Sequence, residues 1–239
     1  MPIREISEAF AVDDIVPYFQ PIIDLQSQHV WRYECLARLV TGNDKMFLPS
    51  EFLYLIERDK HVQALTESMF CQCASYFENI NIPWNINISA TDLLDKGLTT
   101  RLIAHLANYP NPERVSVEIS ASSALSNPKE VARFVEQNRQ AGIGVFIDNV
   151  GTCPGNIKSL MKLPIRGIKL AGGLIRHYSQ QGEVNEYVDY LLSMCEDNGI
   201  TVIAEHIEND MLLERVSSLP IRYAQGYVFS PPAPNTQPH

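Results

Sequence analysis

At 239 residues, the chain has the size of a single α/β barrel, and its 45% apolar and 20% charged residues are those of a globular domain with a large core. The net charge of −9 argues against nonspecific binding to nucleic acid or to an anionic membrane, because both are polyanions. No apolar stretch reaches the ~20 residues that span a bilayer, and residues 1–10 carry acids where a signal peptide has basic residues. We therefore expect a cytoplasmic protein.

The chain opens with two expected strands, residues 15–25 and 30–39, joined by a short turn. Together they predict a β-hairpin. Side chains alternate between the two faces of a strand, so Glu34, Leu36 and Arg38 should share one face of the second strand.

From residue 49 onward, helical patterns and short apolar runs alternate, which is typical of a parallel sheet covered by helices. The expected strands lie at residues 84–88, 114–119, 144–148, 167–170, 201–205 and 222–225. The expected helices lie at residues 49–58, 62–77, 98–107, 129–140, 183–198 and 208–218. The number of strand–helix units favours a closed barrel over an open sheet. We expect one barrel domain over residues 1–232 and a disordered, Pro-rich tail over residues 233–239.

Polar side chains stand near the ends of these expected strands, where burial would favour apolar ones. They are Glu34, Asn87, Glu118, Asp148, Lys169, Glu205 and Gln225. The carboxyl ends of the strands of a β/α barrel meet on one face, so these side chains should converge. Carboxylates with an amide oxygen suit Mg²⁺ or Mn²⁺ better than zinc, and a lysine with a further glutamate could activate a water. Any one of these residues alone could cap a loop or form a salt bridge, but the whole set indicates a metal-dependent phosphoester or sugar-phosphate site.

Several segments resemble the EAL domain family of bacterial cyclic-di-GMP phosphodiesterases, with Glu34-Cys35-Leu36 at the position of the family's Glu-Ala-Leu. The matching segments are residues 18–24, 33–38, 85–89, 117–120, 148–151, 168–169, 202–205 and 225–231. They follow the family order over nearly the whole chain. The resemblance implies a modified (β/α)8 barrel, TIM-like with an antiparallel first strand, which agrees with the expected hairpin.

The resemblance also implies a site with two divalent cations, Mg²⁺ or Mn²⁺, that converts cyclic di-GMP to linear pGpG. The positions that match the ligands of the first cation are Glu34, Asn87, Glu118 and Asp148. The positions that match the pair handling the attacking water are Lys169 and Glu205. The ligand-binding positions are Leu36, Arg38, which matches an arginine that holds a phosphate, and Gln225.

The chain departs from the family pattern around the second cation. Asn149 replaces the second of two aspartates, so this cation position should be weakened, because an amide keeps an oxygen donor but loses the charge. Ala121 replaces a glutamate that steadies the following loop, and Ala171 replaces an aspartate. The loop over residues 150–156 is also altered.

We therefore expect a cyclic-di-GMP-binding signalling domain with impaired or lost phosphodiesterase activity. Two alternatives are a working but slow phosphodiesterase and a protein-interaction module that no longer binds nucleotide. The retention of four family positions, Arg38, Lys169, Glu205 and Gln225, disfavours the interaction module. The family also implies a homodimer, with a protein partner or a sensory domain as further candidates. His206, where the family usually has glycine, could be a metal ligand, although a lone histidine is more often incidental.

Overall fold

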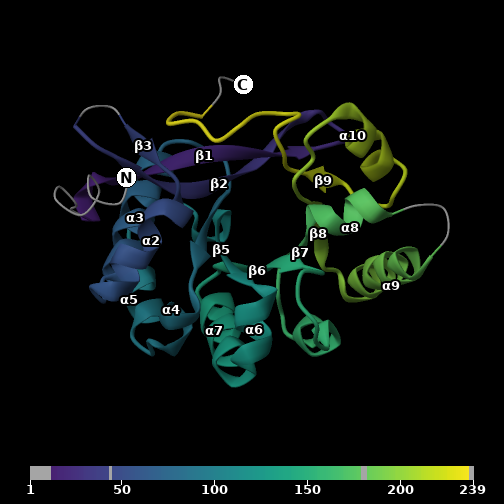
Figure 1. The fold of residues 1–239 in the computed structure, drawn as a ribbon. Coiled ribbons are helices and arrows are strands. Elements are labelled where there is room, and N and C mark those ends of the chain that lie inside the picture. Colours follow the sequence, from purple (N-terminus) through teal and green to yellow (C-terminus); the bar gives the residue numbers. More distant parts are fainter. Residues whose placement is uncertain (1–11, 43–44, 179–181, 237–239) are drawn as a thin grey trace.

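The structure, a computed structural model, describes residues 12–42, 45–178 and 182–236. Within these residues, strands close into a barrel with helices on its outside (Figure 1). The barrel strands are β1 (Ile15–Asp24), β2 (His29–Val40), β4 (Trp84–Ile88), β5 (Val115–Ser120), β6 (Gly144–Val150), β7 (Gly167–Leu170), β8 (Thr201–Ala204) and β9 (Tyr223–Ala224). A short strand, β3 (Met46–Phe47), pairs with the end of β2.

The first barrel strand has the opposite direction to the others. β1 is antiparallel to both its neighbours, β2 and β9. The remaining neighbours in the barrel pair in parallel, from β2 through β4 to β9. This confirms the modified barrel with an antiparallel first strand that the sequence predicts. It also brings the carboxyl ends of seven strands to one face of the molecule.

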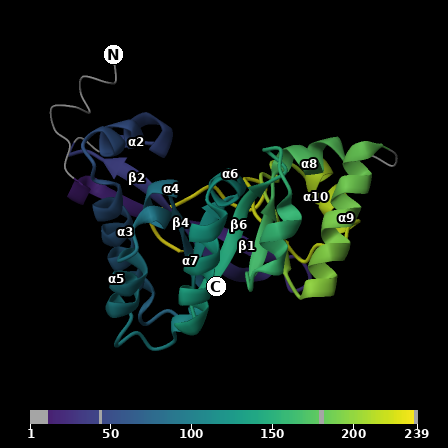
Figure 2. The ribbon, with the colours of Figure 1, turned by 90° about the horizontal axis from the view of Figure 1, so that it is seen from below.

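Helices surround the barrel, and Figure 2 shows α3 and α5 on one side with α9 and α10 on the other. The longer helices are α2 (Pro49–Arg58), α3 (Val62–Phe77), α5 (Leu98–His105), α7 (Pro128–Gln140), α9 (Glu183–Asn198) and α10 (Asp210–Ser217). The 3-10 turns are η1 (Val12–Asp14), η2 (Pro112–Arg114) and η3 (Ile157–Lys162). None of the described helices has the length and apolar character needed to cross a membrane.

Three short helices that the sequence did not predict follow strands almost directly. They are α4 (Ala90–Leu94), α6 (Ala121–Ser126) and α8 (Gly172–His177). Each has only five or six residues, too few to produce a helical periodicity in the sequence. Ser89 and Ser120 cap two of them by accepting hydrogen bonds from the backbone N–H groups of Asp92 and Ser123. These caps end β4 and β5 at defined positions.

The two faces of each strand have different surroundings. Along β5, Val115, Val117 and Ile119 belong to the main hydrophobic core between the strands and the helices. Ser116 and Glu118 alternate with them and face other strands across the barrel interior, where they contact polar groups. The barrel interior is therefore polar along part of its length, and buried apolar packing on the outside supports it.

The end of the barrel opposite the strand carboxyl ends is filled by Arg32 and aromatic rings. The Arg32 guanidinium lies 4.6 Å from the Trp31 ring centroid and 4.9 Å from that of Phe146, and it donates a 3.1 Å hydrogen bond to Ser116 Oγ. Trp31 stacks on Tyr223 at 3.8 Å. Burial, and next the charge of Arg166, lower the pKa of Arg32 from 12.5 to about 9. Arg32 remains charged at neutral pH and is stabilised by π faces and a hydroxyl.

The C-terminal segment is ordered further than its composition predicts. Ala233 and Phe19 exchange two backbone hydrogen bonds of 2.7 and 3.1 Å, and Thr236 donates its N–H to the Tyr76 hydroxyl at 3.0 Å. The expectation of disorder therefore does not hold for residues 233–236, because these contacts fix the segment along β1 and α3. Residues 237–239 lie outside the described residues.

Truncation of Arg32 tests the packing of the closed end. Arg32→Ala should lower the free energy of unfolding by about 2–4 kcal/mol, because it leaves a cavity among the rings. Arg32→Met fills the same space without a buried charge, so its effect should stay within about 1 kcal/mol. Urea denaturation of both variants measures the difference. An equal loss of unfolding free energy in the two variants would show that the charge of Arg32, and not its shape, stabilises the closed end of the barrel.

Candidate active site

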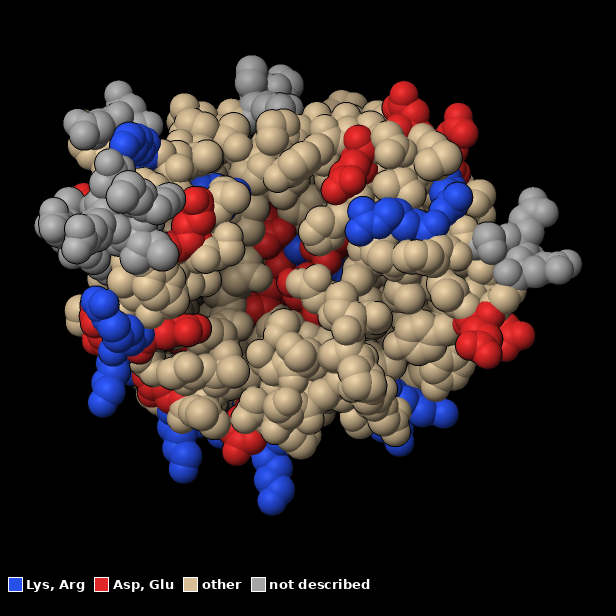
Figure 3. All heavy atoms as spheres, viewed as in Figure 1, with Lys and Arg blue, Asp and Glu red and all other residues tan. Residues whose placement is uncertain are grey.

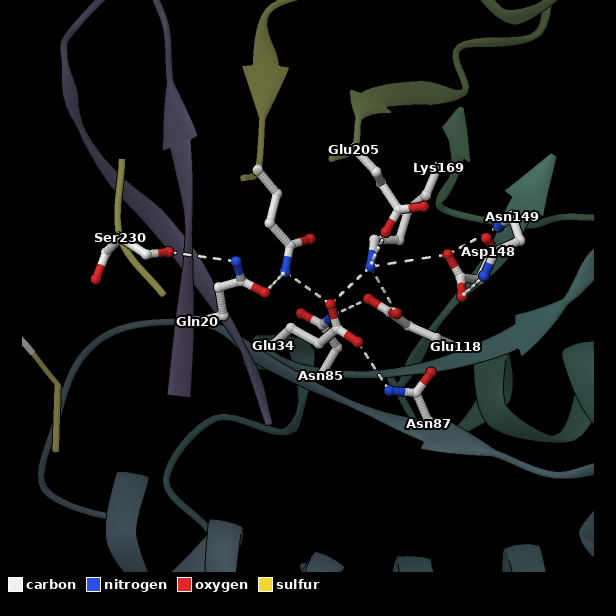
Figure 4. A network of polar contacts seen from close by, with 11 residues as sticks. Gln20, Glu34, Asn85, Asn87, Glu118, Asp148, Asn149, Lys169, Glu205 and Ser230 are labelled. Atoms are coloured by element: carbon white, nitrogen blue, oxygen red, sulfur yellow. Dashed lines mark hydrogen bonds and ion pairs between the residues drawn. The ribbon is translucent and has the colours of Figure 1, made fainter. Parts of the chain in front are cut away.

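The polar residues predicted from the strand ends come together at the carboxyl face of the barrel (Figure 4). Strands carry Glu34 on β2, Asn87 on β4, Glu118 on β5, Asp148 on β6 and Lys169 on β7. Glu205 and Gln225 follow immediately after β8 and β9. The strand register explains the convergence, since Asn87 lies opposite Glu118 and Asp148 opposite Ser120. The sequence prediction that these side chains share one place is therefore confirmed, while their roles stay predictions.

The Lys169 ammonium lies at the centre of the cluster. Its Nζ is 2.8 Å from Glu34 Oε2, 2.9 Å from Glu118 Oε2 and 2.7 Å from Glu205 Oε1. Asp148 Oδ1 is further away, at 3.8 Å. The side chain of Lys169 is 1% exposed, so its charge is out of water and depends on these carboxylates. One ammonium thus faces four carboxylates, which leaves the cluster short of positive charge.

The pKa shifts follow from this imbalance. Burial alone would lower the pKa of Lys169, but the carboxylates around it, first Glu118, raise this pKa well above its usual value. Burial and then the Glu34 charge raise the pKa of Glu118 well above normal, and burial raises the pKa of Glu205 to about 8. Burial opposes ionisation of Glu34 too, yet Lys169 and two amide donors hold its pKa below normal. At neutral pH Lys169 is charged, whereas Glu205 can take up a proton.

Side-chain amides fix the orientation of the carboxylates. Asn87 Nδ2 donates to Glu34 Oε1 at 2.8 Å, and Gln225 Nε2 donates to Glu34 Oε2 at 2.8 Å. Gln225 Nε2 also donates to Gln20 Oε1 at 3.1 Å. The Gln20 amide in turn donates to the backbone oxygen of Ser230 at 3.3 Å. The carboxylates are therefore held in place before any ligand arrives.

Two members of this network were not predicted from the sequence. Asn85, fully buried on β4, donates to Glu118 Oε1. Gln20 lies directly opposite Glu34 in the β1–β2 hairpin. Asn85 could have been found from its spacing of two from Asn87, which places both on one face of the strand. Gln20 required the hairpin register, which the sequence did not define.

Asn149 is bound to its neighbour Asp148. Its side-chain Nδ2 donates to Asp148 Oδ2 at 2.7 Å, and its backbone N–H donates to Asp148 Oδ1 at 2.8 Å. Its backbone has a φ of 56°, in the left-handed region. Both oxygens of Asp148 thus receive a hydrogen bond from Asn149, and an ionised aspartate at position 149 could supply only the one from the backbone N–H. If position 149 carried an aspartate, two adjacent carboxylates would repel each other in place of this side-chain hydrogen bond.

A cavity of about 410 Å³ opens above the cluster, and Figure 3 shows the hollow with acidic side chains at its floor. Among its lining residues are Glu34, Leu36, Arg38, Asp148, Asn149, Glu205, His206 and Gln225. A second cavity of about 290 Å³, between β2, β4, α2 and α3, adjoins it. Leu36 and Asn87 line both cavities. Of the two ligand-binding residues predicted on β2, Leu36 therefore lies between the two cavities, and Arg38 lines the larger one.

The donor set fits a divalent cation of the hard, oxygen-binding kind. Within the part of the chain that the structure describes, no three His, Cys, Asp or Glu side chains are placed to hold one ion. The Lys169 ammonium is paired with the carboxylates instead. The fit rests instead on unmet charge and unmet hydrogen bonds. Buried Oε2 of Glu205 and buried Oε1 of Gln225 have no hydrogen-bond partner among the described residues. An ion held by Glu34, Asn87, Glu118 and Asp148 would supply the missing positive charge.

The other positions at which we expect a departure from the family pattern are Ala121, Ala171 and the loop over residues 150–156. Ala121 and Ala171 are buried at the starts of α6 and α8, directly after β5 and β7. In the altered loop, Thr152 donates its hydroxyl to the backbone oxygen of Asn149 at 2.8 Å. These positions therefore directly follow the strands that carry Glu118, Asp148 and Lys169.

Comparison with known proteins gives one consistent result. A family model described as "EAL domain" matches residues 3–232. The chain is 24% identical over 236 residues to the cyclic di-GMP phosphodiesterase PdeB of Shewanella oneidensis, and 26% identical over 247 residues to the cyclic di-GMP phosphodiesterase RocR of Pseudomonas aeruginosa. Each alignment covers 96% of this chain, but only 28% of PdeB and 62% of RocR. The chain thus corresponds to part of the length of these relatives.

Solved structures share the fold. The FimX EAL domain of Pseudomonas aeruginosa, bound to c-di-GMP, superposes with a TM-score of 0.87 at 21% identity and covers 98% of both chains. The PaMucR phosphodiesterase in complex with c-di-GMP superposes with a TM-score of 0.84 at 20% identity, over 92% of this chain and 97% of the other. At such identities the likeness establishes the barrel and its topology.

The Asp148–Asn149 pair leads to a test of cation dependence. Asn149→Asp replaces the side-chain amide donor by a second carboxylate beside Asp148. Without divalent cations, the two carboxylates should repel each other by about 1 kcal/mol, which corresponds to a fall in Tm of about 2–4 °C. Mn²⁺ should then raise the Tm of this variant more than that of the wild type. Differential scanning fluorimetry in EDTA and in Mn²⁺ measures both effects.

Asn149→Gly is the matched control, because it removes the side-chain donor without adding charge and suits the positive φ. It should not gain the larger response to Mn²⁺. An Asn149→Asp variant that is as stable as the wild type in EDTA, with the same response to Mn²⁺, would contradict this account of the pair.

Proposed function

The chain belongs to the EAL domain family, and we propose that it is a cyclic-di-GMP-binding signalling domain whose phosphodiesterase activity is impaired or lost. The observation that carries this proposal is the buried carboxylate cluster around Lys169, open to a cavity that Arg38 also lines. Such a site suits a phosphodiester beside a divalent cation. The c-di-GMP complexes of FimX and PaMucR, with the same fold, support the choice of ligand.

Arg38 is the residue proposed to hold a phosphate. Arg38 is 7% exposed, and its guanidinium lies 5.9 Å from the Tyr18 ring centroid. One nitrogen, Nη1, donates to the backbone oxygen of Ala37 at 2.8 Å. The other side of the planar guanidinium can bind two phosphate oxygens, and no carboxylate forms an ion pair with it among the described residues.

The adjoining 290 Å³ cavity suits a nucleobase. It is lined mainly by apolar side chains, including Leu36, Leu65 and Met69. Asp92 lies at its wall, fully buried, with Oδ2 accepting hydrogen bonds from Thr66 and Ser89 and Oδ1 without a partner among the described residues. An apolar slot with one free acceptor favours a flat ring that carries N–H donors.

The residues around the cluster have distinct proposed roles in hydrolysis. A divalent cation held by Glu34, Asn87, Glu118 and Asp148 would polarise the phosphodiester and lower the pKa of a bound water. Lys169, with its raised pKa, stays protonated and holds the carboxylates in place. Glu205 Oε2 has no hydrogen-bond partner among the described residues. A nearby cation would favour the ionised form of Glu205, which could accept a proton from the attacking water.

The impairment is proposed to arise at the second cation. Asn149 lacks the charge of an aspartate, and its amide hydrogens are directed to Asp148, so the second ion has a weak site. Ala121 and the 150–156 loop differ from active relatives as well. For this reason Asn149→Asp alone is not expected to restore strong activity.

A working but slow phosphodiesterase, favouring Mn²⁺, is the second candidate. Two observations favour it. Lys169 and Glu205 form a close ion pair, and the similar proteins PdeB and RocR are both described as cyclic di-GMP phosphodiesterases. A cytoplasmic location and a homodimer, both expected from the sequence, belong to the proposal. So does a link to a sensory domain or a protein partner.

Binding and hydrolysis can be measured separately on the same protein. Calorimetric titration with cyclic di-GMP in Ca²⁺ should show binding, and Arg38→Ala should weaken it at least tenfold, because a charge-assisted contact to phosphate is lost. Arg58→Ala is the control, since Arg58 is exposed and pairs with Asp59. Incubation with Mg²⁺ or Mn²⁺ should release little or no pGpG.

The two measurements separate the candidates. Turnover close to that of active family members would reject the impaired domain in favour of a phosphodiesterase. No heat of binding, together with no thermal shift, would reject nucleotide binding and favour an interaction module.

A further inference from the structure

The backbone at His206 has a conformation that side chains other than glycine rarely adopt. Among the described residues, four that are not glycine have a positive φ, namely Gln28 at 61°, Lys60 at 59°, Asn149 at 56° and His206 at 57°. Gln28 and Lys60 are exposed and lie in turns after β1 and α2. Asn149 and His206 line the 410 Å³ cavity. Backbone strain of this kind is concentrated at functional sites, where a particular side chain is required.

The chain makes room for the His206 side chain. A Cβ atom at Gly172, on α8, would lie 2.5 Å from His206 Cβ and 2.9 Å from the backbone oxygen of Glu205. Gly172 therefore allows α8 to start beside residue 206. The side chain of His206 is exposed at the cavity wall, next to the Glu205 carboxylate.

His206 is also a free hydrogen-bond donor in a cavity where the amides are engaged. The amides that donate to protein acceptors are those of Gln20, Asn87, Asn149 and Gln225. No hydrogen bond joins the His206 imidazole to any residue in the described ranges. The lining also contains the acids Glu34, Asp148, Glu205 and Glu208. An anionic ligand therefore needs donors to offset this negative wall.

Arg38 can serve only one side of the cavity. It extends from β2, whereas His206 follows β8, and the strands β9 and β1 separate these two in the barrel. A cyclic dinucleotide carries two phosphates on opposite sides of its ring. We propose that His206 donates a hydrogen bond to the phosphate that Arg38 does not hold, an inference that rests on the proposed function. Each tautomer of imidazole carries an N–H, so the contact does not depend on the charge of the ring.

Removing the side chain without harming the fold tests this role. His206→Gly relieves the positive φ, so its Tm should equal or exceed that of the wild type. Its Kd for cyclic di-GMP, by calorimetric titration in Ca²⁺, should rise about tenfold. Lys60→Gly is the matched control, because it relieves the same kind of φ away from the cavity and should leave the Kd unchanged. His206→Asn tolerates the φ and keeps an N–H donor, so it should bind more tightly than His206→Gly.

The outcomes separate this inference from the proposed function. Wild-type binding with an unchanged Kd in His206→Gly would overturn the inference and leave the proposed function standing. A marked loss of Tm in His206→Gly would assign the residue to the fold and overturn the inference as well. Equal affinities of His206→Asn and His206→Gly would reject the donor role. Failure of the wild type to bind would overturn both proposals.

Discussion

The buried ion cluster around Lys169 is the interaction on which the site depends. An ammonium and carboxylates removed from water are stable only where each has a partner at close range. Three carboxylates lie within 2.9 Å of Lys169 Nζ, and a fourth lies at 3.8 Å. They come from strands that are far apart in the sequence, so the cluster forms only when the barrel closes. The presence of four carboxyl groups around one ammonium is the reason that we propose a cation at this site.

Hydrogen bonds from the surrounding side-chain amides orient the carboxylates of the cluster. Glu34 is oriented by Asn87 and Gln225, and Glu118 by Asn85. Asp148 accepts two hydrogen bonds from Asn149. We propose that Glu34, Asn87, Glu118 and Asp148 hold one ion, and that the uncharged Asn149 side chain holds a second one weakly. Such a site would keep ligand binding while hydrolysis is impaired or lost.

The sequence was sufficient to predict the barrel and the convergence at its carboxyl face. Glu118, Asp148 and Lys169 each interrupt an apolar strand, and parallel strands bring their ends together whatever their exact bounds. Contacts that depend on register were not predictable, as Gln20 and Asn85 show. The burial of Arg32 among aromatic rings was not predictable either, because it requires the closed end of the barrel. Residues 233–236 are held by backbone hydrogen bonds, which cannot be predicted from the amino-acid composition of the segment.

The central claim is that the cluster holds one divalent cation well and a second one poorly. Anomalous scattering from crystals grown with Mn²⁺ and cyclic di-GMP tests it most directly. The account predicts one strong peak within bonding distance of Glu34, Asn87, Glu118 and Asp148, and at most a weak peak beside Asn149. Two peaks of equal height, or no peak among these side chains, would contradict it.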